Sequence, residues 1–110
     1  MVARDFIYTD SNKKYSVRLV RPCVEDPNKY IAESNFERAF SMKILCSILR
    51  ELGVADLKCS EGLGVARFKL LDKSIMLYRR GRIDIRRVKS EQDAIETIEN
   101  VKKMIKDAFN

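Results

Sequence analysis

The residues of this chain that could do chemistry are cationic and aromatic rather than catalytic. Guanidinium and ammonium groups neutralise phosphates, and a tyrosine ring can stack on a base or a sugar. Residues of these kinds recur on one side of the strand-like alternation, and the candidate binding set is Arg18, Lys58, Arg67, Lys69, Tyr78, Arg82 and Arg86. The set predicts a surface that binds DNA or RNA.

The excess positive charge is concentrated in one part of the sequence. The whole chain has 22 Lys and Arg against 16 Asp and Glu, a net charge of +6. Between Asp56 and Lys89, ten Lys and Arg stand against four acids, which is also a difference of +6. Because this window is rich in strand-like patterns, it predicts an electropositive sheet surface.

The same pattern has simpler interpretations. Cations on a strand face keep a sheet soluble and its edges unpaired, and Tyr78 can be a cross-strand packing partner. Asp84 would place a negative charge within the face, either paired with an arginine or in contact with an amino group of a ligand. Val20, Val65 and Met76 on that face would also suit a protein partner. The alternative function is therefore a protein–protein interaction or homodimerisation module that uses the same face.

No catalytic constellation is visible in the sequence. Histidine is absent, which removes Ser-His and Cys-His pairs, imidazole metal ligands and the commonest general base. The three cysteines, Cys23, Cys46 and Cys59, are odd in number and far apart, so they have neither the spacing of a zinc site nor the even count of a disulfide framework. We expect them to be reduced and mostly buried, with Cys23 the most accessible, which favours a cytoplasmic location. These observations predict a non-enzymatic protein without a metal or other cofactor.

Length and hydropathy favour a single globular domain over residues 1–110. That length is enough for one hydrophobic core. No segment approaches the roughly 20 apolar residues that span a bilayer, and the N-terminus lacks the apolar region of a signal peptide. A membrane protein is not expected.

Periodicity predicts the elements that position the candidate residues. Alternation predicts strands over 6–9 and 15–20, followed by a connection over 22–33 with a possible helical turn at Asp26–Pro27. Four further strands are expected between residues 56 and 88, and Gly81 is predicted at a positive φ in the last turn.

Two amphipathic helices complete the predicted fold. Capping-box patterns start them at Ser34 and Ser90, and they extend over 34–52 and 90–109, the first ending at Gly53. The predicted core is Leu45, Ile48, Leu49, Leu57, Phe68, Leu77, Ile83, Ile85, Ile95, Ile98 and Ile105. The expected fold class is α+β, a two-layer sandwich with both long helices on one face of an antiparallel sheet.

The segment from Ile75 to Lys106 resembles the second half of a repeat of the TATA-box-binding protein. Tyr78 stands at the aromatic that ends a strand, Arg80–Arg82 at the turn, and Val88–Ser90 at the step into an acidic helix start. The strand–helix–strand order upstream is also similar. The resemblance implies a curved sheet forming half of a saddle, and hence a homo-oligomer. The chain departs from the family in having one repeat, no aromatic near Leu63–Gly64, and arginines in place of small polar residues near 86–87.

Overall fold

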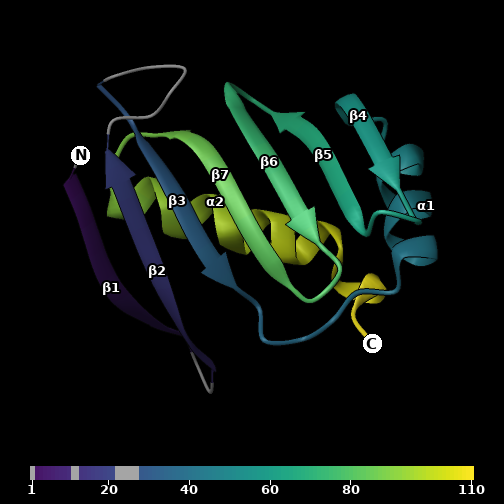
Figure 1. Cartoon of the computed structure of the whole chain (residues 1–110), viewed down its shortest axis with the longest axis horizontal. Helices are drawn as coiled ribbons and strands as arrows, with labels where there is room; N and C mark the ends of the chain where they lie inside the picture. Colours follow the sequence, from purple (N-terminus) through teal and green to yellow (C-terminus); the bar gives the residue numbers. More distant parts are fainter. Residues whose placement is uncertain (1, 11–12, 22–27) are drawn as a thin grey trace.

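The computed structural model describes residues 2–10, 13–21 and 28–110, without the side chains of residues 2–4, 8–10 and 13–15. The described residues form a seven-stranded antiparallel sheet, two α-helices and one short 3-10 helix (Figure 1). In chain order these are β1 (Val2–Asp10), β2 (Lys13–Arg21), β3 (Tyr30–Asn35), α1 (Met42–Leu52), β4 (Ala55–Ser60), β5 (Val65–Leu70), β6 (Lys73–Tyr78), β7 (Arg82–Val88), α2 (Glu91–Met104) and η1 (Lys106–Ala108).

The strands lie in the order β1-β2-β3-β7-β6-β5-β4. Figure 1 shows α2 crossing behind the central strands, while α1 lies beside β4 at one end of the sheet. The predicted α+β class is therefore confirmed, and the side of the sheet away from the helices is called the open face below. Among the described residues, no helix is both long and apolar enough to cross a membrane.

Strict alternation separates the core from the open face. On β5 and β6, and on β7 as far as Ile85, inward residues that are buried or partly buried alternate with more exposed ones, because each strand turns one row of side chains towards the helices. Most of the predicted core is fully buried, and Ile48, Leu57 and Ile95 are only partly buried. The predicted residues that are buried are Leu45, Leu49, Phe68, Leu77, Ile83, Ile85, Ile98 and Ile105.

The strand β3 lies in the middle of the sheet, where part of a connection and the start of a helix were predicted. It pairs with β2 on one side and β7 on the other. Ser34 is buried and its hydroxyl donates to the carbonyl oxygen of Ser16 at 2.7 Å. Ser34 is therefore a strand residue that is hydrogen-bonded to β2, and it does not cap a helix. The predicted helix start at Ser34 is wrong. The predicted turn at Asp26–Pro27 lies outside the described residues.

The helix α1 begins after a short link whose backbone amides donate hydrogen bonds to a side chain and to a neighbouring turn. Asn35 Oδ1 accepts from the Glu37 amide at 2.7 Å, and the Phe40 amide donates to the carbonyl of Arg79 at 2.7 Å. Ser41 is the N-cap, because its Oγ accepts from the amide of Ile44 at 3.4 Å.

The ends of the helices divide into confirmed and corrected predictions. Gly53 ends α1 with a φ of 66°, as predicted. Ser90 caps α2: its Oγ accepts from the Asp93 amide at 3.1 Å, and Asp93 Oδ2 accepts from the Lys89 amide at 2.8 Å. The helix stops at Met104 rather than at 109. The chain then turns so that the ring of Phe109 stacks on Phe40, with 4.9 Å between centroids.

A disulfide joins Cys46 of α1 to Cys59 of β4. The prediction that these two cysteines are reduced is wrong, because the helix and the edge strand bring their Cα atoms within 5.7 Å, inside the range a disulfide spans. Cys23 lies outside the described residues. The cysteines therefore no longer argue for a cytoplasmic location.

Gly81 closes the β6–β7 turn with a φ of +104°, which confirms the predicted positive φ. A Cβ atom at this position would lie 2.4 Å from the carbonyl oxygen of Arg38, which belongs to the link before α1. The turn and the link are also joined directly, since the Phe36 amide donates to the Gly81 carbonyl at 2.8 Å. A side chain here would force the two segments apart.

We expect thiol titration of the denatured, unreduced protein to find one reactive thiol per chain, that of Cys23. After reduction all three cysteines should react. The disulfide closes a short loop, since its cysteines are separated by 13 residues. Loss of the bond should therefore lower the free energy of unfolding by about 2–4 kcal/mol. Three reactive thiols without a reductant would contradict the disulfide.

Gly81→Ala should lower the free energy of unfolding by about 1–3 kcal/mol, because it combines a disfavoured φ with a clash against backbone. The control is Gly62→Ala. Gly62 has no atom within 4 Å of an added Cβ and no positive φ, so its change should stay within about 0.5 kcal/mol. Urea unfolding of both variants measures the difference, and equal effects would contradict the close approach to Arg38.

Candidate nucleic-acid interface

The strand register gathers the predicted site residues on the open face. One row of directly opposed residues crosses all seven strands from β1 to β4, and its members are Asp5, Arg18, Glu33, Asp84, Met76, Arg67 and Lys58. The other predicted residues alternate in phase with this row: Lys69 and Arg86 are each opposite Ser74, Tyr78 is opposite Val65, and Arg82 is opposite Asn35. All the candidate residues therefore share one surface.

Acids divide this surface into two parts. Arg18 Nε lies 3.8 Å from Asp5. Arg82 forms a two-pronged contact with Asp84, at 2.9 and 3.2 Å, and its guanidinium also lies 3.7 Å from Glu33. Much of the positive charge predicted for Arg82 is therefore balanced within the sheet, whereas the side chains of Arg18 and Asp5 are both more than half exposed and their pair contributes little. The sequence interpretation included Asp84 but not Asp5 or Glu33.

Tyr78 is engaged with its neighbours. Its hydroxyl donates to Asp84 Oδ2 at 3.1 Å, and the guanidinium carbon of Arg82 lies 5.4 Å from the centre of its ring. Burial raises the pKa of Tyr78, and the charge and hydrogen bond of Asp84 raise it further. These contacts favour the cross-strand packing role that was weighed against base stacking.

The basic corner is the part of the open face that carries Lys58, Arg67, Lys69 and Arg87. Lys58 and Arg67 form no ion pair with any described residue. Lys69 lies 3.5 Å from Asp56, but both side chains are more than half exposed, so this pair contributes little. Positive charge is thus available in the basic corner, whereas the charge of Arg82 on the same face is balanced by acids.

Two adjoining hollows lie in the basic corner. The smaller, about 320 Å³, lies over β4 and β5 beside Lys58, and the larger, about 470 Å³, includes Arg87. Arg67, Lys69 and Ser74 line both. The cations therefore surround concave surface instead of pointing away from a flat sheet.

Arg87 was not among the predicted site residues, and a β-bulge puts it here. Tyr30 is opposite Val88 and Ala32 is opposite Ile85, so β7 carries one residue more than β3 over this stretch. Arg87 takes the extra position with a φ of 70°. The signal was present in the sequence, because unbroken alternation after Ile85 would bury Arg87 and expose Val88.

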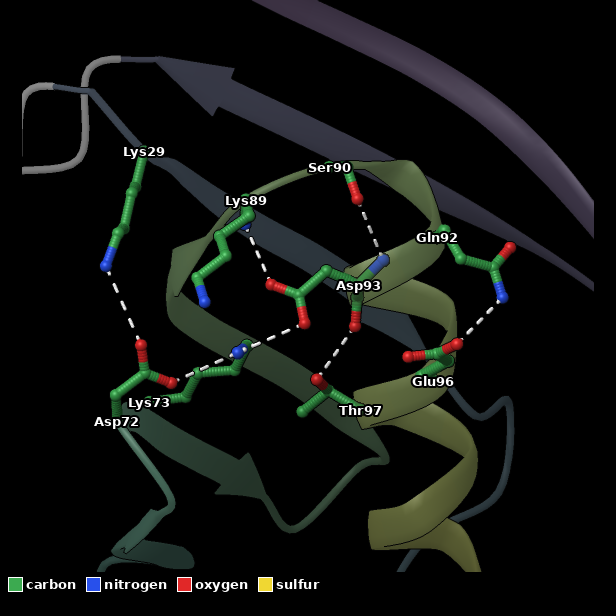
Figure 2. Close-up of polar contacts among 9 residues, drawn as sticks. All are labelled: Lys29, Asp72, Lys73, Lys89, Ser90, Gln92, Asp93, Glu96 and Thr97. Carbon is green, nitrogen blue, oxygen red and sulfur yellow. Dashed lines mark hydrogen bonds and ion pairs between the residues drawn. The ribbon is translucent and has the colours of Figure 1, made fainter.

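A buried ionic network lies beneath the larger hollow, on the helix side of the sheet (Figure 2). Lys73 is 6% exposed, and its Nζ lies 3.1 Å from Asp93 of α2 and 3.2 Å from Asp72. Lys29 approaches the other oxygen of Asp72 at 3.6 Å. Although burial alone would lower the pKa of Lys73, the hydrogen bonds to Asp93 and Asp72 outweigh it and raise the pKa. The network fixes the first turn of α2 to the start of β6.

The chemistry that this surface offers is ionic recognition. In the described part of the chain, no group of three or more His, Cys, Asp or Glu could hold a metal ion. The arrangement suits an anionic ligand that meets cations from several strands. Comparisons of the chain with protein-family models, with curated proteins and with solved structures find no match.

Lys73→Met should destabilise the protein by about 3–5 kcal/mol near neutral pH, because it leaves two carboxylates without their buried cation. The pKa of Lys73 is raised above 10.5 in the folded state, so its contribution is complete below that pH and is lost as the pH rises through the folded pKa. Urea unfolding at a series of alkaline pH values should show this loss.

The pKa of Tyr78 is also raised, and its linkage has the same sign. Both proteins of the comparison therefore carry Tyr78→Phe, so that they differ from each other only at Lys73. The Lys73→Met variant should lose less stability than its parent above about pH 10.5. Parallel alkaline profiles would show that Lys73 does not stabilise the fold as a charged group.

Proposed function

We propose that this protein is a non-enzymatic nucleic-acid-binding module that holds phosphates with the basic corner of its open sheet face. One observation carries the proposal: four cations line two adjoining hollows, and they are Lys58, Arg67, Lys69 and Arg87. Of these, Lys58 and Arg67 form no ion pair with any described residue. Such a surface binds a polyanion by releasing its counterions.

The contacts on the rest of the face favour binding to the backbone over the reading of bases. Tyr78, Arg82 and Asp84 bond to one another, so their polar groups are committed within the sheet. Phosphate contacts position a protein without carrying sequence information. The proposed activity therefore has little sequence preference, and the basic corner contributes more to it than Arg82, whose guanidinium is bound to Asp84.

The resemblance to a TATA-box-binding-protein repeat is part of this proposal. After the first hairpin, the elements run strand, helix, four strands and helix, an order that supports the resemblance. Tyr78 ends β6, Arg80–Arg82 lies at the turn, and Val88–Ser90 leads into α2. In this proposal β1 and β2 extend the sheet beyond β3, and a second copy of the chain supplies the other half of the binding surface.

Use of the same face for a protein partner or for homodimerisation is the alternative. The location in the cytoplasm stays a prediction as well, and the Cys46–Cys59 disulfide removes the argument from reduced cysteines that favoured it. Both the alternative and the main proposal need the open face, and they differ in their dependence on salt.

Fluorescence anisotropy with single-stranded and duplex oligonucleotides, at several salt concentrations, tests the proposal. Log affinity should fall linearly with log salt by about 0.7–0.9 for each phosphate contact. Arg67→Gln and Lys58→Gln should each remove about one contact from this slope and weaken binding on all sequences. Arg82→Gln should have a smaller effect, because the guanidinium is already bound to Asp84.

The matched control is Lys103→Gln, which makes the same change of charge on an exposed residue of α2, on the opposite side of the sheet. Its affinity and salt slope should equal those of the parent protein. Absence of binding at about 50 mM salt would refute the proposal. A dimer detected by sedimentation under those conditions would then favour the protein-interaction alternative.

A further inference from the structure

We propose that the larger hollow of the basic corner is a pocket for a phosphate group. In this assignment Arg67, Lys69 and Arg87 supply positive charge, and the hydroxyl of Ser74 supplies a further donor. The inference deepens the proposed function by naming the group that is recognised and the place where it binds. It does not require that group to belong to a nucleic-acid strand.

The pocket is built by three strands and a turn. Arg67 and Lys69 come from β5, Ser74 from β6 and Arg87 from β7, while the turn between β5 and β6 closes one end with Asp72. Lys69 and Ser74 are directly opposed in the sheet, so two donors face the pocket from neighbouring strands. Its volume of about 470 Å³ lies within the range of small-ligand sites.

The charges around the pocket favour an anion. Asp72 is the acid that lines it, and the ammonium groups of Lys73 and Lys29 lie 3.2 and 3.6 Å from its carboxylate oxygens. Burial alone would raise the pKa of Asp72, but the hydrogen bond and the charge of Lys73 lower it on balance. The carboxylate is therefore ionised and already neutralised, which leaves the three lining cations without an equal opposing charge.

Arg87 supplies an independent observation that points to a ligand. It is a non-glycine residue at a φ of 70°, a conformation that costs backbone strain, and it lies beside the pocket. Its Nε is buried and has no hydrogen-bond acceptor among the described residues. Glu37, Asp56 and Leu71 also have a positive φ, so the distinctive feature of Arg87 is the buried donor without an acceptor, which is uncommon in folded proteins.

The geometry suits phosphate better than a carboxylate. A phosphate monoester carries close to two negative charges near neutral pH and has three strong acceptor oxygens. Two cations from β5 and an arginine from β7 line the pocket, with the hydroxyl of Ser74 on β6 between these strands, so donors are available to several oxygens of one phosphate. Arginine also binds phosphate through two parallel N–H groups, which fits a position fixed by a bulge.

Direct titration with inorganic phosphate tests the pocket. Calorimetry and phosphorus-31 NMR are preferable to a thermal shift, because phosphate stabilises folded proteins in general by exclusion from their surfaces. With ionic strength held constant by chloride, we expect saturable binding of one phosphate per chain. Arg67→Gln and Arg87→Gln should each weaken it about tenfold or more, since each removes a charge-assisted hydrogen bond.

Lys103→Gln is again the control and should bind phosphate like the parent protein. Because Arg87 lies in a strained bulge, circular dichroism first checks that the Arg87→Gln variant folds. If that variant does not fold, the Arg67→Gln variant, which changes an exposed residue, tests the assignment alone. Unsaturable binding, or equal binding by the parent and the Arg67→Gln variant, would overturn the assignment.

Competition by a nucleoside monophosphate and binding of an oligonucleotide show which kind of phosphate the pocket accepts. They also test the pocket separately from the proposed function. A nucleoside monophosphate that competes with inorganic phosphate supports a pocket that accepts phosphate esters, while failure to compete would show that the pocket takes free phosphate only and does not hold the phosphates of a strand. Phosphate binding without oligonucleotide binding would support the phosphate pocket and refute the proposed nucleic-acid function. Salt-dependent oligonucleotide binding without saturable phosphate binding would support the proposed nucleic-acid function and refute the phosphate pocket.

Discussion

The bulge at Arg87 is the constraint on which the arrangement of this protein most depends. The strand β7 lies in the centre of the sheet, and its alternation buries Ile83 and Ile85. Without an extra residue, the next inward position would be an arginine, and Val88 would face outward. The bulge inverts that phase: Val88 is fully buried, and the chain then leaves the strand towards the helix side, where Ser90 starts α2. One positive φ therefore preserves the core, directs the second helix and places a cation on the open face.

The buried lysine is the second part of this design. Lys73 occupies an inward position of β6, in phase with Ile75 and Leu77, where an unpaired charge would be costly. The first turn of α2 supplies Asp93, whose other oxygen accepts from the Lys89 amide just after the bulge. The same carboxylate thus caps the helix and neutralises the lysine. Asp72 completes the neutralisation and, through this pairing, is no longer an uncompensated acid at the edge of the basic corner.

The sequence could predict those elements whose signals are local. Ser90 and Asp93 form a reciprocal cap within four residues, and Gly53 and Gly81 take the positive φ that no other common residue adopts easily. The strand β3 was beyond that reasoning. Ser34 and Glu37 match a capping pattern as well as Ser41 does, and only the neighbouring strands β2 and β7 decide that Ser34 bonds to Ser16 instead. A central strand obtains its hydrogen bonds from residues far along the chain, so its local pattern can be ambiguous.

The candidate surface shows the same division between what is local and what depends on pairing. Alternation was enough to put the predicted cations on one face, because the period of a strand fixes which side each residue takes. It could not show that Asp5 lies beside Arg18, or that Glu33 and Asp84 share Arg82, since those contacts depend on the order of strands. Strand order therefore gives a surface on which Glu33 of β3 and Asp84 of β7 balance Arg82, while Lys58 of β4 and Arg67 of β5 form no ion pair with a described residue. The charge that remains available to a ligand lies where Arg67 forms no ion pair with any described residue and where the bulge adds Arg87.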